Sequence, residues 1–181
     1  GLLGPNGAGK STTLRVLYTV LRPDQGSATI DGCDVVTDSL AARRRIGALP
    51  HGAGLYPHLT ARENIAYYAA LCGIDKSEID DRVAAIIDLL EIGEFSDRRT
   101  KGFSHGQRTK VALARALVHD PRNVILDEPT SGLDPAHQLS LLELFRAKAR
   151  GGMAIVLSMH DLHLAARFSD RICLLSEGRT A

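Results

Sequence analysis

A glycine-rich stretch at the start of the chain fits the pattern G-x-x-x-x-G-K-[ST]. It consists of Gly4, Pro5, Asn6, Gly7, Ala8, Gly9, Lys10, Ser11 and Thr12. The glycines allow backbone angles that other residues avoid, so consecutive N–H groups turn inward and form an anion-binding nest. Lys10 then reaches the β- and γ-phosphates of a nucleotide, and the Ser11 hydroxyl ligates Mg²⁺. The stretch predicts a nucleoside triphosphate site. The alternative is a glycine-rich turn that matches by chance.

The residues around this loop predict a strand before it and a helix after it. Leu14, Leu17 and Leu21 fall at helical spacing, and Pro23 stops the run. A helix that begins at the loop adds the positive end of its dipole to the anion site. Only the segment 1–3 precedes the loop, and the chain does not begin with Met. We therefore expect one domain over residues 1–181, truncated at its N-terminus and also at its C-terminus.

Composition excludes several classes of protein. The 181 residues suffice for one domain with a core, and a net charge of +1 shows no bias toward nucleic acid or anionic membranes. Three widely spaced cysteines favour free thiols in a reducing compartment over a disulfide framework or a zinc site. The sequence shows no signal peptide and no apolar run near the ~18 residues of a membrane helix. A soluble, cytoplasmic chain is expected.

Short apolar segments alternate with amphipathic ones along the chain. Strands are predicted at 27–30, 46–49, 124–126, 153–158 and 172–175. Helices are predicted at 41–45, from 106 to about 118, from 135 toward 151, and at 161–168. This alternation predicts an α/β fold of the phosphate-loop NTPase type, with a mainly parallel sheet covered by helices on both faces.

Residues 55–101 depart from that alternation. Thr60 and Glu63 form a capping box before one helical pattern, and Ser77 with Asp80 predicts a second box before another. Since no strand pattern separates the two helices, we expect a small helical subdomain inserted at 55–101. The alternative is a pair of ordinary crossover helices.

Two acidic residues follow the apolar segment 124–126. Asp127 stands where a phosphate-loop NTPase needs a carboxylate to hold Mg²⁺. Glu128 beside it could orient or deprotonate an attacking water. Two acidic residues after a strand, taken by themselves, more often belong to a solvent-exposed edge of the sheet. The phosphate loop reverses that interpretation.

The order of motifs in the second half resembles one family. The segment Phe103-Ser104-His105-Gly106-Gln107 resembles the signature motif of ATP-binding cassette (ABC) ATPases. Downstream lie Asp127-Glu128-Pro129-Thr130, the loop Ser131-Gly132-Leu133-Asp134, and His160 at the place of the family's switch histidine. With the phosphate loop, these motifs cover nearly the whole chain.

The resemblance implies ATP and Mg²⁺ as cofactors and a particular assembly. Two subunits would face head to tail with two ATP molecules between them. Ser104, Gly106 and Gln107 would then bind the γ-phosphate held by the second subunit. His160 would contact the γ-phosphate, Asp134 would link the two sites, and Glu128 and Lys10 would complete the catalytic set. A permease partner would hold the subunit at the inner face of the cell membrane. The alternatives for His160 are a loop histidine without a catalytic role and a metal-binding pair with His163.

The sequence departs from the family at two positions. His105 replaces the second glycine of the signature, while Ser104 and Gly106 are kept. His51 stands where members carry a glutamine that touches Mg²⁺ and the docking helix of the membrane subunit. Imidazole is a poorer Mg²⁺ ligand than an amide oxygen, so the metal role of His51 is doubtful. His51 either contacts the γ-phosphate or attacking water, or packs in the docking groove.

Segments 54–64 and 104–110 most resemble ATPase subunits of two-component sodium-extrusion exporters. The resemblance therefore predicts an ATPase that powers a membrane exporter, either of sodium or of a drug, lipid or polysaccharide. A non-transport ABC ATPase would show coiled-coil arms, zinc cysteines or a basic face. A kinase would need a lid and an acceptor site, and it would leave residues 104–107 unexplained. A GTPase would need an N-K-x-D motif that recognises the guanine base. A nucleic-acid partner is not expected.

Overall fold

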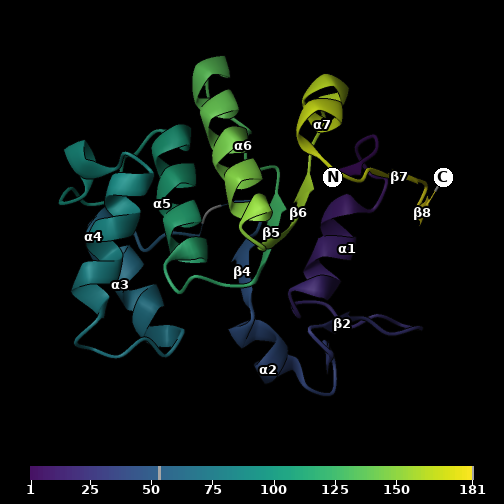
Figure 1. Ribbon diagram of the computed structural model, residues 1–181, viewed down its shortest axis with the longest axis horizontal. Coiled ribbons are helices and arrows are strands. Elements are labelled where there is room, and N and C mark those ends of the chain that lie inside the picture. Colours follow the sequence, from purple (N-terminus) through teal and green to yellow (C-terminus); the bar gives the residue numbers. More distant parts are fainter. Residues whose placement is uncertain (53, 181) are drawn as a thin grey trace. The chain divides into compact units, whose positions relative to one another are not determined.

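The computed structural model describes residues 1–52 and 54–180, so Ala53 and Ala181 of the predicted domain lie outside it. The chain divides into two compact units, Gly1–His51 with Arg122–Ala181, and Gly52–Pro121. The predicted subdomain 55–101 falls within the second unit, which also contains the helix after Ser104. Each unit is described by itself below (Figure 1).

The first unit is built on a six-stranded sheet in the order β4-β5-β6-β1-β7-β8. The strands are β1 (Leu2–Leu3), β4 (Ile46–Leu49), β5 (Asn123–Asp127), β6 (Ala154–Ser158), β7 (Cys173–Ser176) and β8 (Arg179–Thr180). Neighbouring strands pair in parallel except β7 and β8, which are antiparallel. The predicted, mainly parallel sheet is thus confirmed.

Helices cover both faces of this sheet. They are α1 (Lys10–Leu17), α2 (Ser39–Arg44), α6 (Pro135–Arg150) and α7 (Leu162–Phe168). Ile125 packs with Leu14 and Tyr18 of the α1 segment in one buried cluster. Its strand neighbours Val124 and Leu126 are fully buried as well. Because successive side chains of a strand point to opposite faces, the sheet is buried on both sides at β5.

Two local predictions in this unit were wrong. The helix after the phosphate loop ends at Leu17, before the predicted stop at Pro23. Thr19 adopts the left-handed conformation, with φ of 66°, and the Val20 N–H donates to the Arg15 carbonyl. These two features end the helix without a glycine. Leu21 then lies beyond the helix and is partly exposed. The strand predicted at 27–30 is β2 (Thr29–Ile30) alone, and it pairs with β3 (Cys33–Asp34), which was not predicted.

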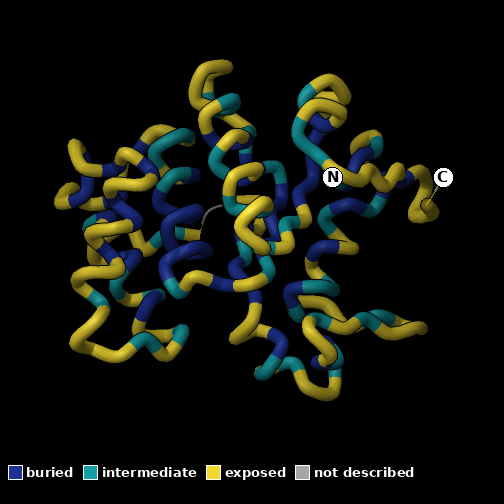
Figure 2. Tube along the Cα trace, in the orientation of Figure 1, coloured by how far each residue is buried: buried dark blue, intermediate teal, exposed yellow. Residues whose placement is uncertain are grey.

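The second unit packs α3 (Ala61–Leu71), α4 (Ile79–Leu89), the 3₁₀ turn η1 (Gly93–Phe95) and α5 (His105–Leu117). Figure 2 shows α5 as its most continuously buried helix, in line with the burial of almost every residue from Thr109 to Leu117. The Thr60 capping box is confirmed. The Ser77 box is wrong: Ser77 donates to the nearby Asp75 carboxylate, so α4 begins after Glu78 without a side-chain cap.

Candidate nucleotide site

The phosphate loop joins β1 to α1, and its glycines take backbone angles that other residues avoid. Gly4, Gly7 and Gly9 have φ of 155°, 81° and 99°. At Gly4 a Cβ would lie 2.2 Å from the Leu175 carbonyl oxygen, so no larger residue fits. Gly9 is the N-cap of α1 in the left-handed conformation. The N-terminal turn of α1 carries no acidic residue, so its positive dipole end stays available to an anion.

The Lys10 side chain lies folded over this loop. Its Nζ donates to the carbonyls of Gly4 at 2.8 Å and Pro5 at 3.1 Å, and the residue is buried. A buried ammonium requires acceptors or an anion around it. The backbone turn of the loop, the N-terminus of α1 and the Lys10 ammonium therefore lie close together. This arrangement suits a phosphate group.

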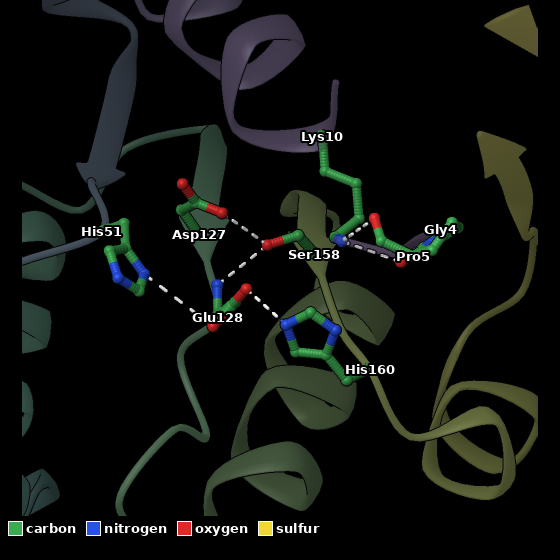
Figure 3. Close-up of polar contacts among 8 residues, drawn as sticks. All are labelled: Gly4, Pro5, Lys10, His51, Asp127, Glu128, Ser158 and His160. Carbon is green, nitrogen blue, oxygen red and sulfur yellow. Dashed lines mark hydrogen bonds and ion pairs between the residues drawn. The ribbon is translucent and has the colours of Figure 1, made fainter. Parts of the chain in front are cut away.

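Two adjacent parallel strands bring the polar groups together at their carboxyl ends. Asp127 ends β5, Ser158 ends β6, and the two residues are register partners. The Ser158 hydroxyl donates to Asp127 Oδ1 at 2.7 Å and accepts the Glu128 N–H at 2.9 Å (Figure 3). Sequence reasoning missed Ser158. Its signal was a hydroxyl at the end of an otherwise apolar strand.

The Glu128 carboxylate lies between two imidazole rings, as Figure 3 shows. His160 Nε2 is 2.5 Å from its Oε1, and His51 Nδ1 is 3.8 Å from its Oε2. The backbone of Glu128 is in the left-handed region, with φ of 54°. The site therefore includes His51 beside Glu128 in the same unit, although its side chain is 61% exposed.

The residues present fit a Mg²⁺ ion. Asp127 is 2% exposed, and its Oδ2 has no hydrogen-bond partner within the part of the chain that the structure describes. Such a buried carboxylate oxygen requires a cation or water. Ser11, half-buried in the first turn of α1, supplies a hydroxyl oxygen. Carboxylate and hydroxyl oxygens are the hard donors that Mg²⁺ prefers.

Asp134 is exposed and caps α6. Its carboxylate accepts the backbone N–H of His137 at 3.1 Å and also contacts the His137 ring. These hydrogen bonds, the backbone one first, hold the pKa of Asp134 below its usual value. The predicted cap and the proline at the first helical position are thus as expected, whereas the contact with His137 was not predicted.

The signature residues belong to the other compact unit. Ser104 caps α5 and forms a full capping box with Gln107: each side chain accepts the backbone N–H of the other residue, at 3.2 and 3.1 Å. Gly106 lies in the first turn of the same helix. An ordered helix N-terminus with no acidic residue in its first turn favours an anion nearby.

A phosphate loop, a carboxylate pair at the end of a parallel strand and a histidine after the next strand define a phosphate-loop NTPase. The family model described as "ABC transporter" matches residues 1–131. The chain belongs to this family, as its ATPase component.

Curated relatives differ in how much of their length the chain covers. It is 38% identical to the ABC transporter ATP-binding protein NatA of Bacillus subtilis (strain 168), over 98% of the chain and 73% of that protein. It is 36% identical to the Nod factor export ATP-binding protein I of Rhizobium etli, over 99% of the chain but only 57% of that protein.

Solved structures share the fold across the chain. A dimeric ATP-binding cassette in a post-hydrolysis state, bound to ADP and Pi, is 30% identical with a TM-score of 0.89, over 99% of this chain and 83% of its own. An ATP-binding subunit of an ABC transporter is 31% identical with a TM-score of 0.90, over 99% and 75%. Among the described residues of this chain, none of the helices has the length and apolar character needed to cross a membrane.

Proposed function

We propose that the chain binds Mg-ATP, hydrolyses it at the Glu128 site and powers a membrane exporter. The observation that supports this most is the Glu128 carboxylate, which is paired with His160 next to a buried Asp127 oxygen. The phosphate loop and Lys10 would bind the β- and γ-phosphates. Ser11 and Asp127 would hold Mg²⁺, which when bound neutralises charge on the phosphates.

The geometry gives Glu128 and His160 separate tasks. As a general base Glu128 would act through its ionised carboxylate, which only accepts hydrogen bonds, so His160 would donate from Nε2 to Oε1. The 3.8 Å gap between Oε2 and His51 is too long for a hydrogen bond and leaves lone pairs on Oε2. Glu128 can therefore accept a proton from a water that attacks the γ-phosphorus, while the β–γ bridging bond breaks and ADP leaves.

A second copy completes the proposed site. The capped N-terminus of α5, with Ser104, Gly106 and Gln107, would bind the γ-phosphate of the ATP held by the other copy. Asp134 would link the two sites. The dimeric form of the related cassette bound to ADP and Pi supports this assembly.

An apolar surface on the second unit supports a permease partner. Tyr56 and Tyr67 stack edge to face and are 44% and 45% exposed, and Leu71 on the same helix as Tyr67 is 63% exposed. Buried Asn64 fixes the backbone of this segment through hydrogen bonds to both the N–H and the carbonyl of Tyr56. A preformed aromatic surface of this kind suits an apolar helix of a membrane subunit. The subunit would then act at the inner face of the membrane.

Sodium is the substrate that we propose. It is supported by the resemblance of segments 54–64 and 104–110 to sodium-extrusion ATPase subunits. The similarity to a Nod factor export protein, at nearly the same identity, supports a different exported solute as the second candidate. Expression with the membrane partner in a sodium-sensitive host should lower internal Na⁺, and a Lys10→Ala version should not. Unchanged sodium content, together with ATP-dependent export of another compound, would exclude sodium as the substrate. The proposed ATPase function would not be affected by that result.

The ATPase function is tested with Lys10→Ala. Loss of one charged contact to the transition state costs about 10²–10³-fold in kcat. Lys76→Ala removes an exposed lysine of the other unit and serves as the matched control, with hydrolysis close to that of the wild type. A Lys10→Ala protein that hydrolyses ATP at the wild-type rate would refute the proposed function.

A further inference from the structure

The Ser158 hydroxyl is fully buried at the end of β6 and contacts both acidic residues of the site. A hydroxyl has one proton to donate and two lone pairs that accept. Ser158 gives the proton to Asp127 Oδ1 at 2.7 Å and accepts the Glu128 N–H at 2.9 Å. One side chain thus contacts the carboxylate of one residue and the backbone of the next.

The first hydrogen bond decides which oxygen of Asp127 faces the metal position. Since Oδ1 accepts from Ser158, Oδ2 is the oxygen that remains, and it is buried without a partner in the described chain. Without the hydroxyl, the carboxylate could rotate and present either oxygen. Outer hydrogen bonds of this kind commonly orient a metal-binding carboxylate.

The second hydrogen bond holds the backbone from which Glu128 projects. A φ of 54° is uncommon for a residue with a Cβ and persists only where surrounding contacts impose it. The N–H of Glu128 bonds to Ser158, and the side chain then meets His160. Ser158 therefore fixes both the Asp127–Glu128 peptide and the Asp127 carboxylate.

We infer that Ser158 is a positioning residue for ATP hydrolysis, which sets Asp127 Oδ2 toward the metal and the Glu128 carboxylate toward the attacking water. This inference rests on the proposed ATPase function. A purely structural role, the satisfaction of two buried polar groups, is the competing explanation. It would change stability without a selective effect on turnover or on metal binding.

The test compares Ser158→Ala with Ser158→Thr, which keeps the hydroxyl and suits a strand position. Ser158→Ala should lower kcat about 10–100-fold, the usual effect of losing an outer contact to a metal ligand, while KM for ATP changes little. Ser158→Thr should recover most of the lost kcat. Ser140→Ala removes an exposed hydroxyl that donates to the Ala136 carbonyl within α6, so it should match the wild type.

A second readout does not depend on turnover. Mn²⁺ binding in the presence of ADP, followed by electron paramagnetic resonance, should weaken about tenfold in Ser158→Ala and stay near the wild-type value in Ser140→Ala. In a Glu128→Ala background, Ser158→Ala should reduce the residual rate less than it does in the wild type, because the part of its effect that acts through the Glu128 carboxylate is already lost.

The outcomes separate the two proposals. A wild-type protein whose hydrolysis does not depend on Lys10 would refute the proposed function. A Lys10-dependent ATPase in which Ser158→Ala keeps its kcat and Mn²⁺ affinity would refute the positioning role alone. If Ser158→Ala unfolds, Ser158→Thr decides: a folded threonine variant with near wild-type kcat and Mn²⁺ affinity supports the inference, and a folded one without them overturns it.

Discussion

The Glu128 carboxylate and the His160 ring meet at 2.5 Å although 32 positions separate them in the sequence. Each follows one of two neighbouring parallel strands, β5 and β6, whose register sets their spacing. The carboxyl ends of parallel strands meet at one edge of the sheet, where open α/β folds bind their ligands. The contact thus arises from the sheet itself.

His160→Ala should lower kcat strongly because the ring contacts Glu128 and, in the proposed site, would also contact the γ-phosphate. Removal of one such donor typically costs about 10²–10³-fold in kcat. His163→Ala is the matched control, since His163 bonds to Asp161 through its backbone N–H, which the substitution keeps. Equal losses in both variants, with loss of a bound transition metal, would favour the alternative metal pair.

His51 should contribute less than His160. Its ring is 61% exposed and 3.8 Å from Glu128, and exposed ion pairs contribute only about 0.2–1 kcal/mol. His51→Ala should therefore lower kcat by no more than about fivefold, and His51→Gln should lie between the alanine variant and the wild type. Unchanged kcat with loss of stimulation by the membrane partner would instead place His51 in the docking groove.

Sequence patterns predicted the parallel strands of the six-stranded sheet and the residues with strong local signals. Helix starts are such signals, because the conformation or hydrogen bonding of a cap depends on few neighbouring residues. Examples are Gly9, the Thr60 cap and the Asp134-Pro135 helix start. Ser158 could not be found in this way, because its role depends on the register between β5 and β6. The early end of α1 at Leu17 was missed since Thr19, which is not a glycine, takes the left-handed conformation there.

Asp134 should make the stability of α6 depend on pH. Its pKa is lower in the folded than in the unfolded state, so its contribution is complete above the unfolded value of about 3.9 and is lost as the pH falls through the folded pKa. Asp134→Asn keeps a capping side chain that does not titrate. The melting temperature of the wild type should exceed that of Asp134→Asn at neutral pH, and the difference should shrink in acid. A difference that stays constant down to pH ~3 would contradict this.

Ser104→Ala should reduce both stability and turnover. Loss of an N-cap costs about 1 kcal/mol of unfolding free energy, and the proposed contact to the opposite γ-phosphate would be lost too. Thr60→Ala breaks the equivalent capping box of α3 in the same unit. It should cost similar stability but leave hydrolysis without the membrane partner unchanged. Equal ATPase losses in the two variants would assign the Ser104 effect to folding.

The most direct measurement is light scattering of Glu128→Gln with and without Mg-ATP. Glutamine cannot accept the proton of the attacking water, so ATP should bind without being hydrolysed. ATP shared between the phosphate loop of one copy and Ser104 of the other should stabilise the dimer by mass action. We expect a monomer without nucleotide and a stable dimer with Mg-ATP. A Glu128→Gln protein that binds ATP tightly yet stays monomeric, or that hydrolyses ATP at the wild-type rate, would contradict the proposed site.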